Sequence, residues 1–149
     1  MNLQYFLCFL LFYYSHQNIM SQEHFKNLTE EEYKIIVEKG TERPYTGKYD
    51  SFFEAGTYHC KACNAALYRS TSKFNSHCGW PAFDDAIENA IQTEEDNSLF
   101  MKRTEILCKN CGGHLGHVFY GEGFTNSNTR HCVNSISLIF KPLITTSPK

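Results

Sequence analysis

The spacing of hydrophobic residues along this chain changes after Gly47, from a helical period to the shorter period of β-strands. Before that point, apolar residues recur at helical spacing between residues 29 and 40. Thr29-Glu30-Glu31-Glu32 forms a capping box, with Thr29 as N-cap and Glu32 at the third helical position. Gly40 is the expected helix stop. We therefore predict one short N-terminal helix, and we assign it to packing.

The remainder of the chain reads mainly as β-strands. Stretches rich in β-branched and aromatic residues predict strands in four segments: Thr57–Cys60, Leu67–Tyr68, Phe100–Leu107 and Val133–Phe140. Pro142 is expected to end the last of them. The acidic stretch from Asp84 to Asn97 fits either a short helix or a loop.

The first 20 residues stand apart from this pattern because Leu3 to Tyr14 is strongly apolar. The run is too short to span a bilayer, which takes about 20 residues, so no stable membrane insertion is expected. It fits the apolar region of a secretory signal, although no Lys or Arg precedes it and no small-x-small cleavage site follows. Translation that starts at Met20 is the alternative, and the two interpretations stay open.

These observations divide the chain into an apolar segment at residues 1–20, one domain at 21–143 and a polar tail at 144–149. A length of 149 residues suits a single domain with a real core. We expect a cytoplasmic protein, or a protein of the secretory pathway if residues 1–20 act as a signal peptide. We also expect a monomer.

The charge of the chain gives no electrostatic case for nucleic acid as a partner. The formal net charge is -2, and the Lys and Arg residues are scattered rather than gathered in a stripe. Function must therefore be sought in particular side chains.

Cysteine spacing gives the first chemical signal. Four of the seven cysteines form two Cys-x-x-Cys pairs, Cys60/Cys63 and Cys108/Cys111. Four thiolates at this spacing select zinc in tetrahedral geometry, and a site with four protein ligands is closed and structural. The pairs lie far apart in sequence, so one zinc would clamp two distant parts of the domain. Redox-active dithiols are the alternative interpretation.

The two remaining cysteines of the domain, Cys78 and Cys132, lie in contrasting surroundings. Cys132 has Arg130 and Asn134 nearby, and a neighbouring cation stabilises a reactive thiolate. Cys78 precedes Gly79-Trp80-Pro81, a turn signal that places it on a loop. We therefore expect Cys132 to have the lower pKa. A small buried hydrophobe in a strand is the alternative for Cys132.

Two histidines, His114 and His117, follow the second cysteine pair. Because the zinc already has four sulfur ligands, we interpret them as acid/base or orienting groups. Each histidine alone is equally compatible with a surface or core position.

Taken together and in this order, these motifs resemble the B-type methionine sulfoxide reductases, most closely the plant-type branch. The motifs are the two Cys-x-x-Cys pairs, Cys78-Gly79-Trp80-Pro81, His114-Leu115-Gly116-His117-Val118-Phe119 and Arg130-His131-Cys132-Val133-Asn134-Ser135. The resemblance extends from about Leu28 to Phe140. It implies an antiparallel β-tent of two small sheets, with a short N-terminal helix and a structural zinc clamp.

The resemblance also implies roles for particular residues. Cys132 matches the catalytic cysteine and Cys78 the resolving cysteine, and the four paired cysteines match the ligands of one zinc. Further matches line the sulfoxide pocket or lie beside the nucleophile: Trp80, His114, His117, Asn134 and Arg130. The implied reaction is thioredoxin-dependent reduction of the R epimer of methionine sulfoxide in oxidised proteins, by way of a sulfenic acid and an intramolecular disulfide.

Within that mechanism we cast His117 as the main donor to the sulfoxide oxygen, with His114 and Asn134 assisting. Trp80 would pack against the methyl group of the substrate. Two departures from the family pattern affect this interpretation. His77 stands where glycine is common, which bears on the mobility of Cys78. Tyr120-Gly121 stands where many bacterial members have an aspartate, so the sequence does not identify the polar group behind His117.

Two rival classes are weighed against this interpretation. A zinc hydrolase or deaminase needs an open metal position and a glutamate beside a ligand, and no such glutamate is found at the ligand positions. A non-enzymatic zinc-containing β-tent binding module would not need the two thiols of Cys78 and Cys132.

Overall fold

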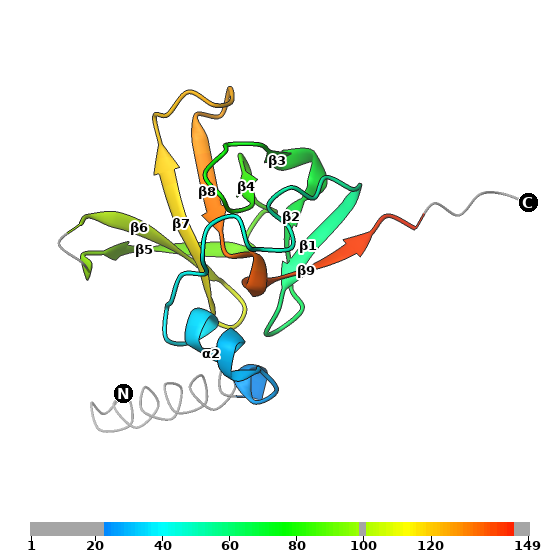
Figure 1. Ribbon diagram of the computed structural model, residues 1–149, viewed down its shortest axis with the longest axis vertical. Helices are drawn as coiled ribbons and strands as arrows, with labels where there is room; N and C mark the ends of the chain where they lie inside the picture. Colours follow the sequence, from blue (N-terminus) through cyan, green and yellow to red (C-terminus); the bar gives the residue numbers. More distant parts are fainter. Residues whose placement is uncertain (1–22, 99–100, 145–149) are drawn as a thin grey trace, which may run out of the picture.

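Two antiparallel sheets form the body of the protein, as expected (Figure 1). The computed structural model describes residues 23–98 and 101–144. The apolar segment 1–20, most of the polar tail and Phe100 lie outside these residues. In the described part of the chain, no helix is long and apolar enough to cross a bilayer.

The smaller sheet has the strand order β2-β1-β9 and the larger sheet the order β3-β4-β8-β7-β6-β5. The strands of the smaller sheet are β1 (Gly56–Cys60), β2 (Ala66–Arg69) and β9 (Leu138–Pro142). Those of the larger sheet are β3 (Lys73–Phe74), β4 (Ala82–Phe83), β5 (Ile91–Asp96), β6 (Arg103–Cys108), β7 (His114–Tyr120) and β8 (Thr129–Val133). Short 3-10 turns that the structure describes in full are η1 (Ser70–Ser72) and η3 (Ser135–Ser137).

The core lies between the two sheets and is rich in aromatic rings. Phe83 of the larger sheet stacks on Tyr68 at a centroid distance of 4.3 Å and meets Tyr58 edge-on at 5.0 Å. All three rings are fully buried. Aromatic contacts of this kind therefore join the two sheets face to face.

The N-terminal helix α2 (Glu30–Ile36) begins with the predicted capping box. The Thr29 hydroxyl accepts from the Glu32 backbone N–H at 3.2 Å, and the Glu32 carboxylate accepts from the Thr29 N–H at 2.9 Å. The helix ends at Ile36, earlier than Gly40 indicated, and Lys39 rather than the glycine takes the left-handed backbone conformation.

One predicted strand is wrong, because residues 133–140 are divided between the two sheets. Val133 ends β8, η3 turns the chain, and Leu138 begins β9 of the other sheet. The physical reason is Glu42, whose carboxylate accepts from the backbone N–H groups of Ser135 and Ile136. Those N–H groups are thereby withdrawn from any strand ladder.

The acidic stretch from Asp84 to Asn97 contains a strand, which neither expected alternative included. β5 pairs with β6 in register from Ile91↔Cys108 to Asp96↔Arg103. It is the edge strand of the larger sheet, and most of its side chains are exposed, so charged residues are tolerated there. Figure 1 shows β5 and β6 extending from one side of the molecule and β9 from the other.

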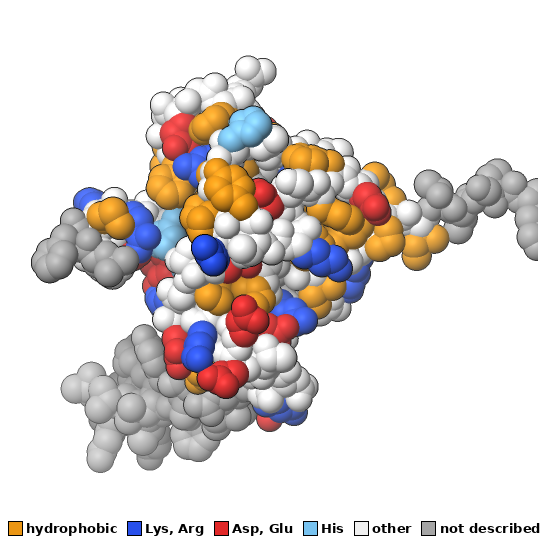
Figure 2. All heavy atoms as spheres, in the orientation of Figure 1, with side chains coloured by type: hydrophobic (Ala, Val, Ile, Leu, Met, Phe, Trp, Pro, Cys, Tyr) orange, Lys and Arg blue, Asp and Glu red, His pale blue; other side chains and the backbone are white. Residues whose placement is uncertain are grey.

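The surface mixes charges of both signs. Figure 2 shows Lys and Arg side chains interspersed with Asp and Glu and with small hydrophobic groups over the face in view. This distribution agrees with the small net charge of -2.

Glu42 connects the segment after the helix to the turn between the sheets, so we predict a large effect of its removal on stability. Glu42→Ala would leave two backbone N–H groups without their acceptor, and Ser135 is buried. The free energy of unfolding should fall by about 1–3 kcal/mol in urea denaturation. Glu38→Ala, a change at an exposed residue four positions earlier, should stay within about 0.5 kcal/mol of the unmodified protein. Equal stability of the two variants would refute this role of Glu42.

Candidate active site

The two adjacent strands β7 and β8 bring a histidine and a cysteine together. His117 and Cys132 are direct partners in this antiparallel pairing, so their side chains lie on the same face of the sheet. Gly116 lies against the Cys132 carbonyl, where a Cβ atom would have no room. Close approach of the two backbones at this point therefore requires glycine.

The loop between β3 and β4 places Cys78 beside Cys132. The two sulfur atoms are 3.7 Å apart, and both thiols are free. His77 and Gly79 on either side adopt positive φ angles of 55° and 92°. His77 thus takes the left-handed conformation that glycine usually adopts, and its carbonyl accepts from the Tyr45 hydroxyl at 2.8 Å. The loop is therefore bent at His77 and held there by the hydrogen bond from Tyr45.

The hydrogen bond between Cys78 and Cys132 changes the pKa values of the two thiols in opposite directions. The hydrogen bond with Cys132 is the largest cause that lowers the pKa of Cys78, to about 5, and the Ser76 hydroxyl adds a further bond at 2.9 Å. The same hydrogen bond, followed by burial, raises the pKa of Cys132. The shared hydrogen bond thus favours the thiolate on Cys78 and the proton on Cys132. This direction is opposite to the one that Arg130 indicates in the sequence, and the order of the two pKa values stays a prediction.

The guanidinium group of Arg130 is already paired. It donates to both carboxylate oxygens of Glu122, at 2.6 and 2.8 Å, and lies 4.4 Å from the ring centre of Phe119. The Glu122 carboxylate therefore offsets positive charge of Arg130 that would otherwise stabilise a thiolate at Cys132. Arg130 still lowers the pKa of both cysteines by its charge, but it is absent from the lining of the pocket described next.

A small surface pocket of about 110 Å³ opens at Cys132. Its lining combines apolar walls with a few polar groups: Thr41, Trp80, Arg103, Gly116, His117, Phe119, Cys132 and Asn134. The pocket thus contains four of the predicted site residues, Trp80, His117, Cys132 and Asn134. Cys78 lies outside this lining, with its sulfur 3.7 Å from that of Cys132.

Glu42 also fixes two walls of the pocket through its backbone. Its carbonyl accepts from the Trp80 indole N–H at 3.0 Å, and its N–H donates to the Asn134 side-chain oxygen at 3.0 Å. The Asn134 amide in turn donates to the Leu115 carbonyl at 3.2 Å. The sequence pattern gave no signal for Glu42, because its partners are all more than 35 positions away.

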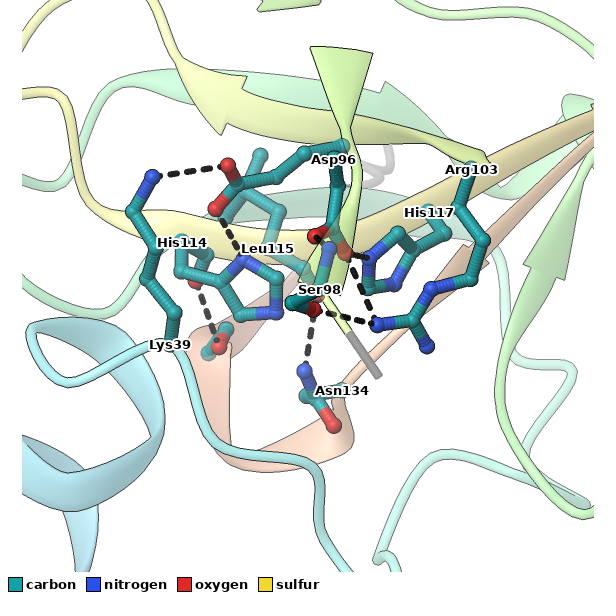
Figure 3. A network of polar contacts seen from close by, with 10 residues as sticks. Lys39, Asp96, Ser98, Arg103, His114, Leu115, His117 and Asn134 are labelled. Carbon is teal, nitrogen blue, oxygen red and sulfur yellow. Dashed lines mark hydrogen bonds and ion pairs between the residues drawn. The ribbon is translucent and has the colours of Figure 1, made fainter. Parts of the chain in front are cut away.

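Each of the two histidines is bound to a carboxylate that the motif analysis missed. His117 Nε2 lies 2.8 Å from Asp96, and His114 Nδ1 lies 2.7 Å from Glu105. Asp96 is therefore the carboxylate behind His117, which settles the question raised by Tyr120-Gly121. Figure 3 shows the two arrangements side by side.

His114 lies deeper than expected. It is almost fully buried, it is absent from the pocket lining, and burial is the largest cause that lowers its pKa. Glu105 is itself buried and pairs with Lys39 at 2.7 Å. The structure therefore brings His114 behind the pocket rather than into it.

The four paired cysteines form one cluster that could hold a metal ion. Their sulfur atoms all lie within 4.8 Å of one another, with Cys60–Cys111 at 3.7 Å and Cys63–Cys108 at 3.6 Å. Tetrahedral zinc with Zn–S bonds of about 2.3 Å would separate its sulfur ligands by about 3.8 Å. The distances fit such an ion. Because Cys60 ends β1 and Cys108 ends β6, the cluster joins the smaller sheet to the larger one.

Comparisons with known proteins agree with this geometry. The SelR domain family matches residues 28–142. The chain is 52% identical over 116 residues to peptide methionine sulfoxide reductase B5 of Arabidopsis thaliana, which covers 77% of this chain and 82% of that protein. It is 48% identical over 129 residues to peptide methionine sulfoxide reductase MsrB of Teredinibacter turnerae, which covers 85% of this chain and 95% of that protein.

Among solved structures, the Mis18 "Yippee-like" domain is similar in fold. The TM-score is 0.50 at 19% sequence identity, and the match covers 60% of this chain and 98% of that one. This likeness concerns the fold alone. The sequence matches are much stronger, and they show that the chain belongs to the SelR family of B-type peptide methionine sulfoxide reductases, which are oxidoreductases.

Proposed function

We propose that this enzyme reduces the R epimer of methionine sulfoxide in oxidised proteins, with Cys132 as nucleophile and Cys78 as resolving cysteine. The observation that carries the proposal is the position of Cys132, which lies in the pocket with Trp80 and His117 and 3.7 Å from Cys78. We assign the roles of the two cysteines from their positions and not from their pKa values, because Cys132 lines the pocket and Cys78 does not.

The first step transfers oxygen from the substrate sulfur to Cys132. The Cys132 proton passes to the Cys78 thiolate, which leaves Cys132 as the nucleophile. His117 donates a proton to the sulfoxide oxygen, with Asn134 beside it, so that the sulfur becomes electrophilic. The substrate S–O bond breaks, a bond from oxygen to the Cys132 sulfur forms, and methionine leaves. The enzyme now holds a sulfenic acid at Cys132.

The second step uses the thiol that Cys78 gained in the first. It condenses with the sulfenic acid, forms a disulfide and releases water. Thioredoxin, a dithiol reductant, then opens this disulfide by thiol exchange and becomes oxidised itself. We propose that the chain acts as a monomer in this cycle, in the cytoplasm unless residues 1–20 direct it to the secretory pathway.

We further propose that the four-cysteine cluster holds one structural zinc ion. All four positions of a tetrahedral site would be taken by protein sulfur, so the ion would hold the sheets together without contacting substrate. Four thiolates within 4.8 Å of one another would repel, so a bound cation would favour the ionised form of all four.

The stereochemical prediction tests the proposed reaction. The pocket has aromatic side chains at Trp80 and Phe119 and polar groups at His117 and Asn134, so the methyl group and the oxygen of the substrate can occupy different sides of it. With a blocked methionine sulfoxide and chiral chromatography, only the R epimer should be consumed. Loss of the S epimer at a comparable rate would contradict the proposed function.

The metal prediction is tested by removing one ligand. Purified protein should contain one zinc per chain by elemental analysis, and Cys108→Ser should lose it together with most of the folded structure. The reason is that structural zinc supplies on the order of 10–16 kcal/mol of apparent binding energy in small domains.

The matched control is Asn110→Ser, a change at an exposed residue between the two cysteines of the same pair. It should keep both the zinc and the far-ultraviolet circular dichroism spectrum. A folded, metal-free Cys108→Ser protein would refute the structural role of the ion.

A further inference from the structure

Asp96 occupies a distinctive place at the end of the edge strand β5. Its Oδ2 atom lies 2.8 Å from His117 Nε2 and accepts from the Arg103 guanidinium at 2.8 Å, while its Oδ1 atom accepts from the Ser98 backbone N–H at 2.9 Å. Figure 3 shows the contacts of this carboxylate with His117 and with the Arg103 guanidinium as dashed lines. His117 and Arg103 line the pocket, whereas Asp96 does not.

This contact fixes which ring nitrogen of His117 carries hydrogen. Hydrogen bonds from Ser98 and then from His117 lower the pKa of Asp96, and the charge of Arg103 acts in the same direction, so the side chain stays ionised. An ionised carboxylate only accepts hydrogen bonds. Nε2 of His117 must therefore carry a hydrogen, and Nδ1 is the ring nitrogen left for the pocket.

The other charged and titratable groups around His117 do not compete for this role. His114 on the same strand lies with its ring centre 5.5 Å away and is held by Glu105, and Cys132 faces His117 from β8. The Glu105–His114 pair resembles the Asp96–His117 pair in chemistry, but it lies behind the pocket. Among the residues that the structure describes, Asp96 is the carboxylate that holds a histidine in the pocket lining.

We propose that Asp96 is a positioning residue for the reaction: it holds the His117 ring so that Nδ1 faces the sulfoxide oxygen, and it stabilises the imidazolium that donates the proton. Arg103 keeps the carboxylate in place by binding the same oxygen. When Nδ1–H gives its proton to the sulfoxide oxygen, His117 becomes neutral and keeps Nε2–H on Asp96. This role rests on the proposed function, because it assigns His117 as the proton donor.

Two variants at Asp96 separate charge from geometry. Asp96→Asn keeps a side chain of the same size but removes the charge, and Asp96→Ala removes both charge and acceptor. We expect kcat for the R sulfoxide to fall about tenfold or more in the first variant and further in the second. A positioned general acid contributes a rate factor of roughly 10²–10⁴, and these losses would be part of that factor. KM should change by less than about twofold, because Asp96 does not line the pocket.

A spectroscopic readout distinguishes positioning from general damage. Long-range ¹H–¹⁵N spectra of the histidine rings should show His117 protonated at Nε2 in the unmodified protein, and a shift of hydrogen toward Nδ1 in Asp96→Ala. Glu95→Gln is the matched control, since Glu95 is the exposed neighbour on β5 and pairs with Lys102 away from the site. It should leave both kcat and the ring spectra unchanged.

An unchanged kcat together with an unchanged His117 spectrum in folded Asp96→Ala would overturn the role of Asp96. A fall in kcat with an unaltered ring spectrum would also overturn it, because the loss would then have another cause. Failure of the proposed function looks different: the unmodified enzyme would not reduce the R sulfoxide, whereas the ring spectra would still report whether Asp96 sets the hydrogen position on His117.

Discussion

The register between β7 and β8 is the constraint on which the site depends. His117 faces Cys132 across this strand pair, so the proton donor and the nucleophile of the proposed reaction meet on one face of the larger sheet. A slip of one residue would turn the Cys132 side chain to the other face and separate the two groups. Gly116 permits the observed register, because a Cβ atom at this position would collide with the Cys132 carbonyl.

Features that are formed by residues adjacent in the sequence could be predicted from the sequence. The Thr29 capping box, the two cysteine pairs and the loop at Cys78 were all predicted from adjacent residues, and the structure confirms them. Contacts between distant segments could not be predicted in this way. Glu42 reaches the turn after β8, and Asp96 reaches His117 across β6; neither residue belongs to a motif. The division of residues 133–140 between two sheets was missed for the same reason.

The surroundings of the cysteine pair include charged groups that adjacent residues in the sequence do not reveal. Arg130 lies near Cys132 in sequence, but in space it is bound by Glu122, and the hydrogen bond with Cys78 favours the proton on Cys132. The proposal of Cys132 as nucleophile therefore rests on its location, since Cys132 lines the pocket and Cys78 does not. Membership of the reductase family also decides between the enzyme and the non-enzymatic binding module in favour of the enzyme.

The central claim, that Cys132 attacks and Cys78 resolves, is tested most directly by the amount of methionine released in a single turnover without reductant. Cys78→Ser should still release about one methionine per enzyme, more slowly because solvent must then take the Cys132 proton, and it should keep a sulfenic acid that dimedone traps, because the thiol 3.7 Å from Cys132 is gone. Cys132→Ser should release none, since a serine hydroxyl is a far weaker nucleophile at neutral pH. A full burst from Cys132→Ser, or no burst from folded Cys78→Ser, would contradict the account.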